Sequence, residues 1–130
     1  MNYVGKMGFS LETVNSDESF DYNLFGSEFL SEYLKHIGVN EQLAYSLTSS
    51  GSFITSDQCK DIVKVYNQDH DMTEGVIKAR SSAGNNPSIT RWGGVKKDED
   101  HKHVSSDIAF MKDFIRFCQS GSRLGGFKVY

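Results

Sequence analysis

The sequence predicts an α-rich α+β fold in a single domain over residues 1–130. Several segments repeat apolar residues at the three-to-four spacing of an amphipathic helix, whereas both ends of the chain carry short β-type segments. The length of 130 residues and the content of 38% hydrophobic and 24% charged residues suit an ordinary globular domain, which can bury a core without metal or disulfide bonds. We therefore expect at least three helices and a pair of terminal strands.

The two terminal segments predict strands that pair with each other. From Met7 onward, Phe9 and Leu11 alternate with small or polar residues, which predicts a half-buried strand over 2–12. The last residues, 127–130, follow a glycine-rich turn and predict a short closing strand.

Three helices follow the first strand along the chain. The first ends at Gly38, begins at a cap on Ser27 or earlier near Tyr22, and has an apolar stripe of Leu30, Tyr33, Leu34 and Ile37. The second covers 41–47 after a cap at Asn40. The third covers 56–67, where a capping box joins Thr55 and Gln58 and the buried stripe is Cys59, Ile62, Val63 and Tyr66.

A fourth, shorter helix is predicted over 71–80, although Gly75 in its middle costs about 1 kcal/mol relative to alanine. Residues 81–103 then lose helical periodicity. A structureless stretch of this length is uncommon in a compact domain, so it is either a functional loop or contains a hairpin over 89–96 that turns at Gly93 and Gly94.

The last helix begins near Ser105, carries a buried stripe of Met111, Phe114, Ile115 and Cys118, and gives way to a turn that contains Gly121, Gly125 and Gly126. Cys59 and Cys118 both fall on apolar stripes, where a free thiol behaves as a small hydrophobic side chain. We expect two buried free cysteines without catalytic chemistry.

Acidic residues are concentrated in the first half of the chain. Residues 1–60 hold eight acids against three lysines, in a chain of net charge −3. Such a distribution attracts basic proteins and disfavours direct binding to nucleic acid. The acids that we expect to bind a partner are Asp17, Glu18, Asp21, Glu28 and Glu32.

Two further features suggest how a partner would be held. Glu28 and Glu32 share a helical face at spacing i, i+4, where like charges repel and a basic partner would relieve the repulsion. Arg91 and Trp92 have the side chains that dominate many interfaces, so we add them to the partner-binding set. The alternative for Trp92 is that its ring covers the core.

The sequence offers little for cofactor or membrane binding. His101 and His103 in the run 98–103 could ligate a metal, although alternating charge in a surface loop is more often only solvated. The sequence has no phosphate-binding glycine loop and no nucleophile elbow, so we expect no cofactor and no enzymatic activity. The sequence also lacks an apolar run of membrane-spanning length and begins without the layout of a signal peptide, so we expect a cytoplasmic protein.

The segments 52–59 and 114–120, followed by Gly125, Gly126 and Phe127, resemble a pattern in small bacterial proteins. A chain of this size and composition is similar to the immunity proteins of bacterial toxin systems, including contact-dependent growth inhibition. This resemblance implies a protein that neutralises a cognate toxin by binding it, and it assigns no catalytic residue. From the acidic residues we expect the toxin to have a basic surface, as a nuclease does, and its active site to be covered by this chain. The alternatives are a small metal-dependent hydrolytic enzyme that uses His101 and His103, and a phage or plasmid regulator of a host enzyme.

Overall fold

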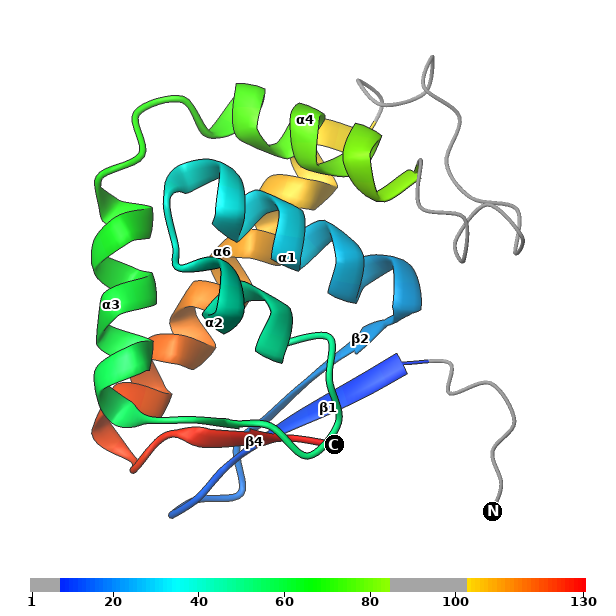
Figure 1. Cartoon of the computed structure of the whole chain (residues 1–130). Helices are drawn as coiled ribbons and strands as arrows, with labels where there is room; N and C mark the ends of the chain where they lie inside the picture. Colours follow the sequence, from blue (N-terminus) through cyan, green and yellow to red (C-terminus); the bar gives the residue numbers. More distant parts are fainter. Residues whose placement is uncertain (1–7, 85–102) are drawn as a thin grey trace.

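The computed structural model of the chain describes residues 8–84 and 103–130 (Figure 1). In this part of the chain the strands and helices are β1 (Gly8–Thr13), β2 (Ser19–Asn23), α1 (Leu24–Ile37), α2 (Glu41–Ser46), β3 (Phe53–Ile54), α3 (Ser56–Asn67), α4 (Met72–Gly84), α6 (Val104–Arg123) and β4 (Phe127–Val129). The predicted helix-rich α+β fold is confirmed.

The strands form one antiparallel sheet in the order β2-β1-β4-β3. In Figure 1 the sheet lies below the helices, which stack on one of its faces. The predicted pairing of the two ends of the chain is confirmed, because Leu11 of β1 lies opposite Val129 of β4. This pairing places the C-terminal strand in the middle of the sheet.

Strand β2 was missed by the sequence prediction, and the predicted cap at Ser27 is wrong. Residues 14–18 form the turn of a β1–β2 hairpin, after which Phe20 and Tyr22 direct their side chains toward the helices. Asn23 caps α1 instead, since its side chain accepts a hydrogen bond of 2.7 Å from the Gly26 N–H. The error arose because a strand of five residues is too short for its alternation to exclude the beginning of a helix.

Several predicted helix boundaries are confirmed. Gly38 ends α1 with a φ of 110°, and the Asn40 side chain caps α2. The capping box of α3 is complete: the Thr55 hydroxyl accepts from the Gln58 N–H at 3.1 Å, and the Gln58 side chain accepts from the Thr55 N–H at 2.9 Å. Local side-chain hydrogen bonds decide where α2 and α3 begin, and the positive φ of Gly38 decides where α1 ends. All three features depend on nearby residues, which is why the sequence could predict them.

Two helices are longer than predicted. Helix α4 continues to Gly84, so residues 81–84 are helical and not part of an irregular segment. Helix α6 continues to Arg123, so Gly121 lies inside a helix and not in a turn. A β-carbon at Gly121 would lie 3.0 Å from Cys59 Sγ, so the glycine permits close packing of α6 on α3. The hairpin predicted over 89–96 lies outside the described residues.

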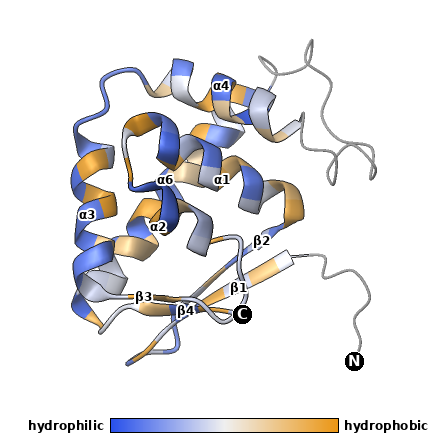
Figure 2. Ribbon diagram, in the orientation of Figure 1, coloured by the Kyte–Doolittle hydropathy of each residue, from blue (hydrophilic) through white to orange (hydrophobic). Residues whose placement is uncertain are grey.

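The core lies between the sheet and the helices and consists of buried hydrophobic side chains from both. Figure 2 shows that the helices and strands around it alternate between hydrophobic and hydrophilic residues. The ring of Phe20 lies within 6.1 Å of four other aromatic rings, centroid to centroid, on β2 and α6. Cys59 and Cys118 are buried and free, as predicted. This core fixes one face of the sheet against the helices and leaves the side chains of the other face exposed.

Candidate functional site

The exposed side of the sheet carries side chains that alternate with those of the core. On β1, Phe9 and Leu11 point inward, whereas Ser10 and Glu12 lie on the outer side. The strand register then places one row of outer residues across all four strands, in the order Ser19, Glu12, Lys128 and Phe53. We call the outer side of the sheet, together with the hairpin turn 14–18, the sheet face.

Large hydrophobic side chains are exposed on the sheet face. Phe53 is 47% exposed, Tyr130 is 45% exposed and Val14 is 54% exposed. Lys128 lies beside them, with its Nζ 5.3 Å from the centre of the Tyr130 ring. Contiguous exposed apolar groups that are bordered by polar residues often mark protein-binding surfaces.

Four acidic residues, Glu12, Asp17, Glu18 and Asp21, are exposed on the same hairpin. None of them forms an ion pair with another residue in the described ranges 8–84 and 103–130. The hairpin turn lies at the lower edge of Figure 1, near the end of α6, where the Asn15 side chain donates a hydrogen bond of 3.1 Å to the Leu124 carbonyl oxygen. The sheet face therefore combines excess negative charge with exposed aromatic rings.

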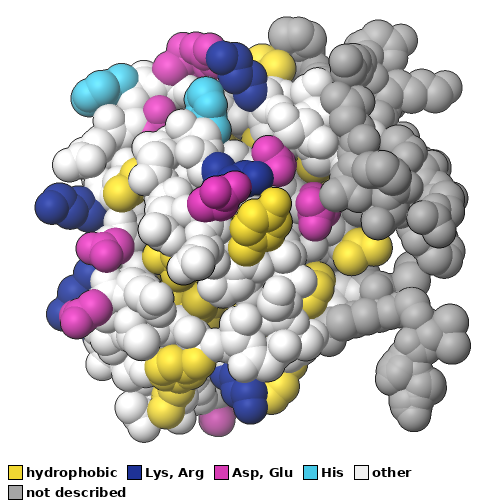
Figure 3. All heavy atoms as spheres, viewed as in Figure 1, with side chains coloured by type: hydrophobic (Ala, Val, Ile, Leu, Met, Phe, Trp, Pro, Cys, Tyr) yellow, Lys and Arg dark blue, Asp and Glu magenta, His cyan; other side chains and the backbone are white. Residues whose placement is uncertain are grey.

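The other two predicted acids lie on a different element. Glu28 and Glu32 are on α1, and Glu32 already pairs with Lys35 at 3.0 Å. On the side of the molecule seen in Figure 3, acidic and basic side chains are interspersed, without a large area of one sign. The five predicted acids are thus divided between the β1–β2 hairpin and α1.

The remaining residues singled out from the sequence lie between 85 and 102, which the structure does not describe, or directly after this range. Arg91, Trp92 and His101 lie outside the described residues. His103 lies immediately before α6 and makes no side-chain capping hydrogen bond there. Among the described residues there is no group of three or more His, Cys, Asp or Glu side chains that could hold a metal. The metal-site alternative on His101 and His103 therefore stays a hypothesis.

A hollow of about 390 Å³ opens where β2, α1, α4 and α6 meet. Its walls include the rings of Phe25, Phe29 and Phe110, and its polar groups include Arg80, Ser106 and Asp107. We call this hollow the aromatic cup. Its volume falls in the range of about 300–1,000 Å³ that is usual for small-molecule sites.

Arg80 and Asp107 form a nearly buried ion pair in the wall of the aromatic cup. Arg80 Nε lies 2.7 Å from Asp107 Oδ2, and Nη2 lies 2.7 Å from Oδ1, with side chains only 12% and 7% exposed. The guanidinium also lies 4.8 Å from the centre of the Phe25 ring. Such a bidentate, stacked geometry is specific to arginine and links α4 to α6.

Sequence reasoning missed this pair, although one signal was present. Asp107 lies four residues before Met111 and seven before Phe114, on the buried stripe of α6. A charge on an apolar stripe requires a buried partner. The partner could not be identified from the sequence, because Arg80 lies on another helix.

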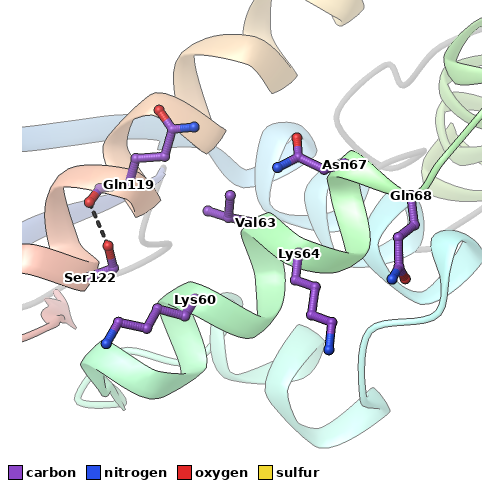
Figure 4. Close-up of a pocket in the computed structure, with 7 residues that line it drawn as sticks. All are labelled: Lys60, Val63, Lys64, Asn67, Gln68, Gln119 and Ser122. Atoms are coloured by element: carbon purple, nitrogen blue, oxygen red, sulfur yellow. Dashed lines mark hydrogen bonds between the residues drawn. The ribbon is translucent and has the colours of Figure 1, made fainter.

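A second hollow of about 450 Å³ lies between α3 and α6 (Figure 4). Lys60 and Lys64 line it together with amide side chains, but Figure 4 shows the two lysine side chains extending from α3 in different directions, with the Gln119 amide on α6. Ser122 donates a hydrogen bond to the Gln119 carbonyl oxygen on its own helix at 2.7 Å. The polar groups do not converge on one point, so we give this hollow no role in ligand binding.

The titratable groups of the core are not arranged for nucleophilic chemistry. Burial raises the pKa of Cys59 to about 12, and burial together with the nearby Cys59 raises the pKa of Cys118 well above its usual value. Burial also raises the pKa of Tyr33, and its hydrogen bond to Asp69 adds to this effect. Both thiols are therefore protonated at neutral pH, whereas the thiolate is the reactive form.

Comparisons of the chain with protein families, with curated proteins and with solved structures find no match. Within residues 8–84 and 103–130, no helix is both long enough and apolar enough to cross a membrane. The candidate sites are thus defined by their own geometry: the sheet face as a protein-binding surface and the aromatic cup as a small concave site.

Proposed function

We propose that this chain is a stoichiometric binding protein of the immunity type, which neutralises a basic partner protein by covering its active site with the sheet face. One observation carries the proposal: the exposed acids of the β1–β2 hairpin lie on the same face as the exposed rings of Phe53 and Tyr130. Interfaces commonly combine aromatic anchors with a surrounding polar rim.

The partner that suits this surface has a cationic active site. A bacterial toxin that cleaves nucleic acid is such a protein, because its active site must attract phosphate groups. A negatively charged inhibitor surface competes for the same site and accelerates the encounter through long-range attraction. The sequence resemblance to immunity proteins supports the same class of partner.

The hairpin turn is the centre of this proposed surface, and α1 is not. Glu32 already has a cationic neighbour in Lys35, so reversing its charge would also remove an intrahelical ion pair. Asp17 and Glu18 are exposed in the turn, and neither side chain makes an ion pair among the described residues. Substitutions at these two positions therefore report on partner attraction with little effect on folding.

The test uses a catalytically inactive form of the protein encoded next to this chain in its genome, and measures association rates by stopped flow at low and high salt. We expect Asp17→Lys/Glu18→Lys to lower the association rate at low salt by about tenfold or more, and to flatten its salt dependence. Glu41→Lys/Asp61→Lys makes the same change of charge on α2 and α3, at two exposed residues that form no ion pair among the described residues, and should have a smaller effect.

A second pair of substitutions tests the aromatic anchors. Phe53→Ser/Tyr130→Ser should raise the dissociation rate more than it changes the association rate, because short-range contacts act mainly after the encounter. If both double variants bind like the unmodified chain, the sheet face is not the interface. If the neighbouring protein does not bind at all, the proposed function fails.

A further inference from the structure

The aromatic cup contains a guanidinium whose hydrogen-bonding capacity is only partly used. Arg80 gives its Nε–H and one Nη2–H to Asp107. The Nη1 group and the second Nη2–H have no acceptor among the described residues. The side chain is 12% exposed, and no Arg80 nitrogen is among the buried unpaired side-chain atoms of the described residues, so water can reach these donors. An acceptor atom that enters the cup would take the place of that water.

The walls of the cup suit a flat apolar group. The Phe29 and Phe110 rings are 5.9 Å apart, and the Phe25 and Phe29 rings are 6.5 Å apart, centroid to centroid. Phe25 and Phe110 are both partly exposed, so their surfaces can be reached. An aromatic ligand that stacks on such rings gains dispersion and removes apolar area from water.

Gly26 keeps one side of the cup open. A β-carbon at this position would lie 3.1 Å from Tyr22 Cβ and 3.8 Å from Phe110 Cζ, so a side chain would crowd the space in front of the Phe110 ring. Gly26 lies in the first turn of α1, where the Asn23 cap already fixes its N–H. The glycine therefore leaves room for a ligand beside the rings.

The charges of the lining select a neutral ligand. Asp107 already balances Arg80 in the wall of the cup. An anion would lie close to the Asp107 carboxylate, whereas a cation would face the N–H donors of Arg80. A neutral carbonyl oxygen accepts hydrogen bonds from arginine without adding charge.

We propose that the aromatic cup binds a small, neutral, planar compound that stacks on Phe25 or Phe110 and accepts hydrogen bonds from Arg80 through a carbonyl oxygen, as an aromatic amide does. The hollow of about 390 Å³ accommodates a ligand of this size. This binding site does not depend on the proposed function of the sheet face, so either proposal can fail without the other.

The test titrates benzamide into the full-length, nitrogen-15-labelled chain and follows the amide and Arg80 Nε–H signals by NMR. We expect saturable shifts at Gly26, Arg80, Ser106 and Asp107, with a dissociation constant in the millimolar range. The positively charged benzylamine and the negatively charged benzoate should bind more weakly, by about tenfold, because the cup favours a neutral ligand.

Two neighbouring positions on α6 provide a matched pair of variants. Ser106 is exposed and lines the cup, so Ser106→Trp should fill the cup with its own ring and abolish the benzamide shifts. Ser105 is also exposed but does not line the cup, so Ser105→Trp should bind benzamide like the unmodified chain. Thermal unfolding checks that both variants fold.

If Ser106→Trp fails to fold, Phe110→Leu replaces it, because loss of the ring should weaken benzamide binding about tenfold. Three results would overturn the proposal: no saturable shift with benzamide, equal binding of all three probes, or unchanged binding to the cup-filling variant. An effect of Ser105→Trp as large as that of Ser106→Trp would also overturn it, since the shifts would then not report on the cup.

Discussion

Gly75 of α4 lies directly against the ring of Tyr33 on α1, where a β-carbon on residue 75 would come within 2.8 Å of Tyr33 Cε1. Tyr33 is fully buried, and its hydroxyl donates a hydrogen bond of 2.9 Å to Asp69 Oδ2. The ring is thus held from both ends and cannot easily move aside. The glycine that weakens α4 as an isolated helix allows α4 to pack against α1.

We expect Gly75→Ala to destabilise the protein. In an exposed helix the change would add about 1 kcal/mol of stability, whereas overpacking in a buried position costs about 1–3 kcal/mol. Urea denaturation measures the difference, with Thr73→Ala at an exposed position of the same helix as the control. A Gly75→Ala protein that is more stable than the unmodified chain would show that the Tyr33 ring can move.

The Arg80–Asp107 pair should show strong energetic coupling. Arg80→Met leaves Asp107 buried without its partner and should lower the free energy of unfolding by about 3–5 kcal/mol. Arg80→Met/Asp107→Leu removes both charges and should lose less than the sum of the two single variants. Urea denaturation of all four proteins completes the cycle, and additive losses would contradict a coupled pair.

The buried thiols predict loss of stability at alkaline pH. The usual pKa of a thiol is 9.0, and burial raises the pKa of Cys59 to about 12. Between these values the unfolded chain releases a proton that the folded chain keeps, so the free energy of unfolding falls as the pH rises through this window. Burial raises the pKa values of Tyr22 and Tyr33 as well, so they act in the same direction.

Urea denaturation between pH 8 and pH 10 tests this prediction. The quantity compared is how steeply the free energy of unfolding falls with pH, not its value at any one pH. We expect Cys59→Ala to lower stability at every pH but to reduce its decline above pH 9.0. Part of the decline should remain in Cys59→Ala, because the pKa values of Tyr22, Tyr33 and Cys118 are also raised in the folded chain. Identical slopes for the two proteins would mean that Cys59 does not keep its proton in the folded state.

Alanine substitutions at two glycines with positive φ angles allow the cost of backbone strain to be compared with the cost of a steric clash. Gly126 has a φ of 91° and Gly51 a φ of 93°, so a side chain is strained at either position. A β-carbon at Gly126 would also collide with the Ile54 carbonyl oxygen, whereas nothing lies within 4 Å of one at Gly51.

We therefore expect Gly126→Ala to lose more stability than Gly51→Ala, for which strain alone costs about 1–2 kcal/mol. Thermal unfolding monitored by circular dichroism provides the comparison. In Gly126→Ala, hydrogen exchange should show that backbone amides of the β3–β4 pairing, where Ile54 lies opposite Phe127, lose protection. Equal losses would show that β3 can shift to admit a side chain.

The sequence determined the features that depend on neighbours along the chain. The capping box of Thr55 and Gln58 and the left-handed Gly38 are local structures, so they were predicted correctly. The apolar stripe of α6 also follows from local periodicity. Strand β2 was missed because five residues carry too little periodic signal, and its pairing with β1 supplies the stability that its own sequence does not show.

Only the tertiary structure decided the candidate sites. Arg80 and Asp107 are 27 residues apart in sequence and meet because α4 and α6 pack together. Phe53 and Tyr130 share the sheet face because β3 and β4 pair, and Glu32 is neutralised locally by Lys35 although its spacing suggested a docking patch. Periodicity shows which side of an element is buried, but which elements then meet depends on long-range packing, so the sites could not be read from the chain alone.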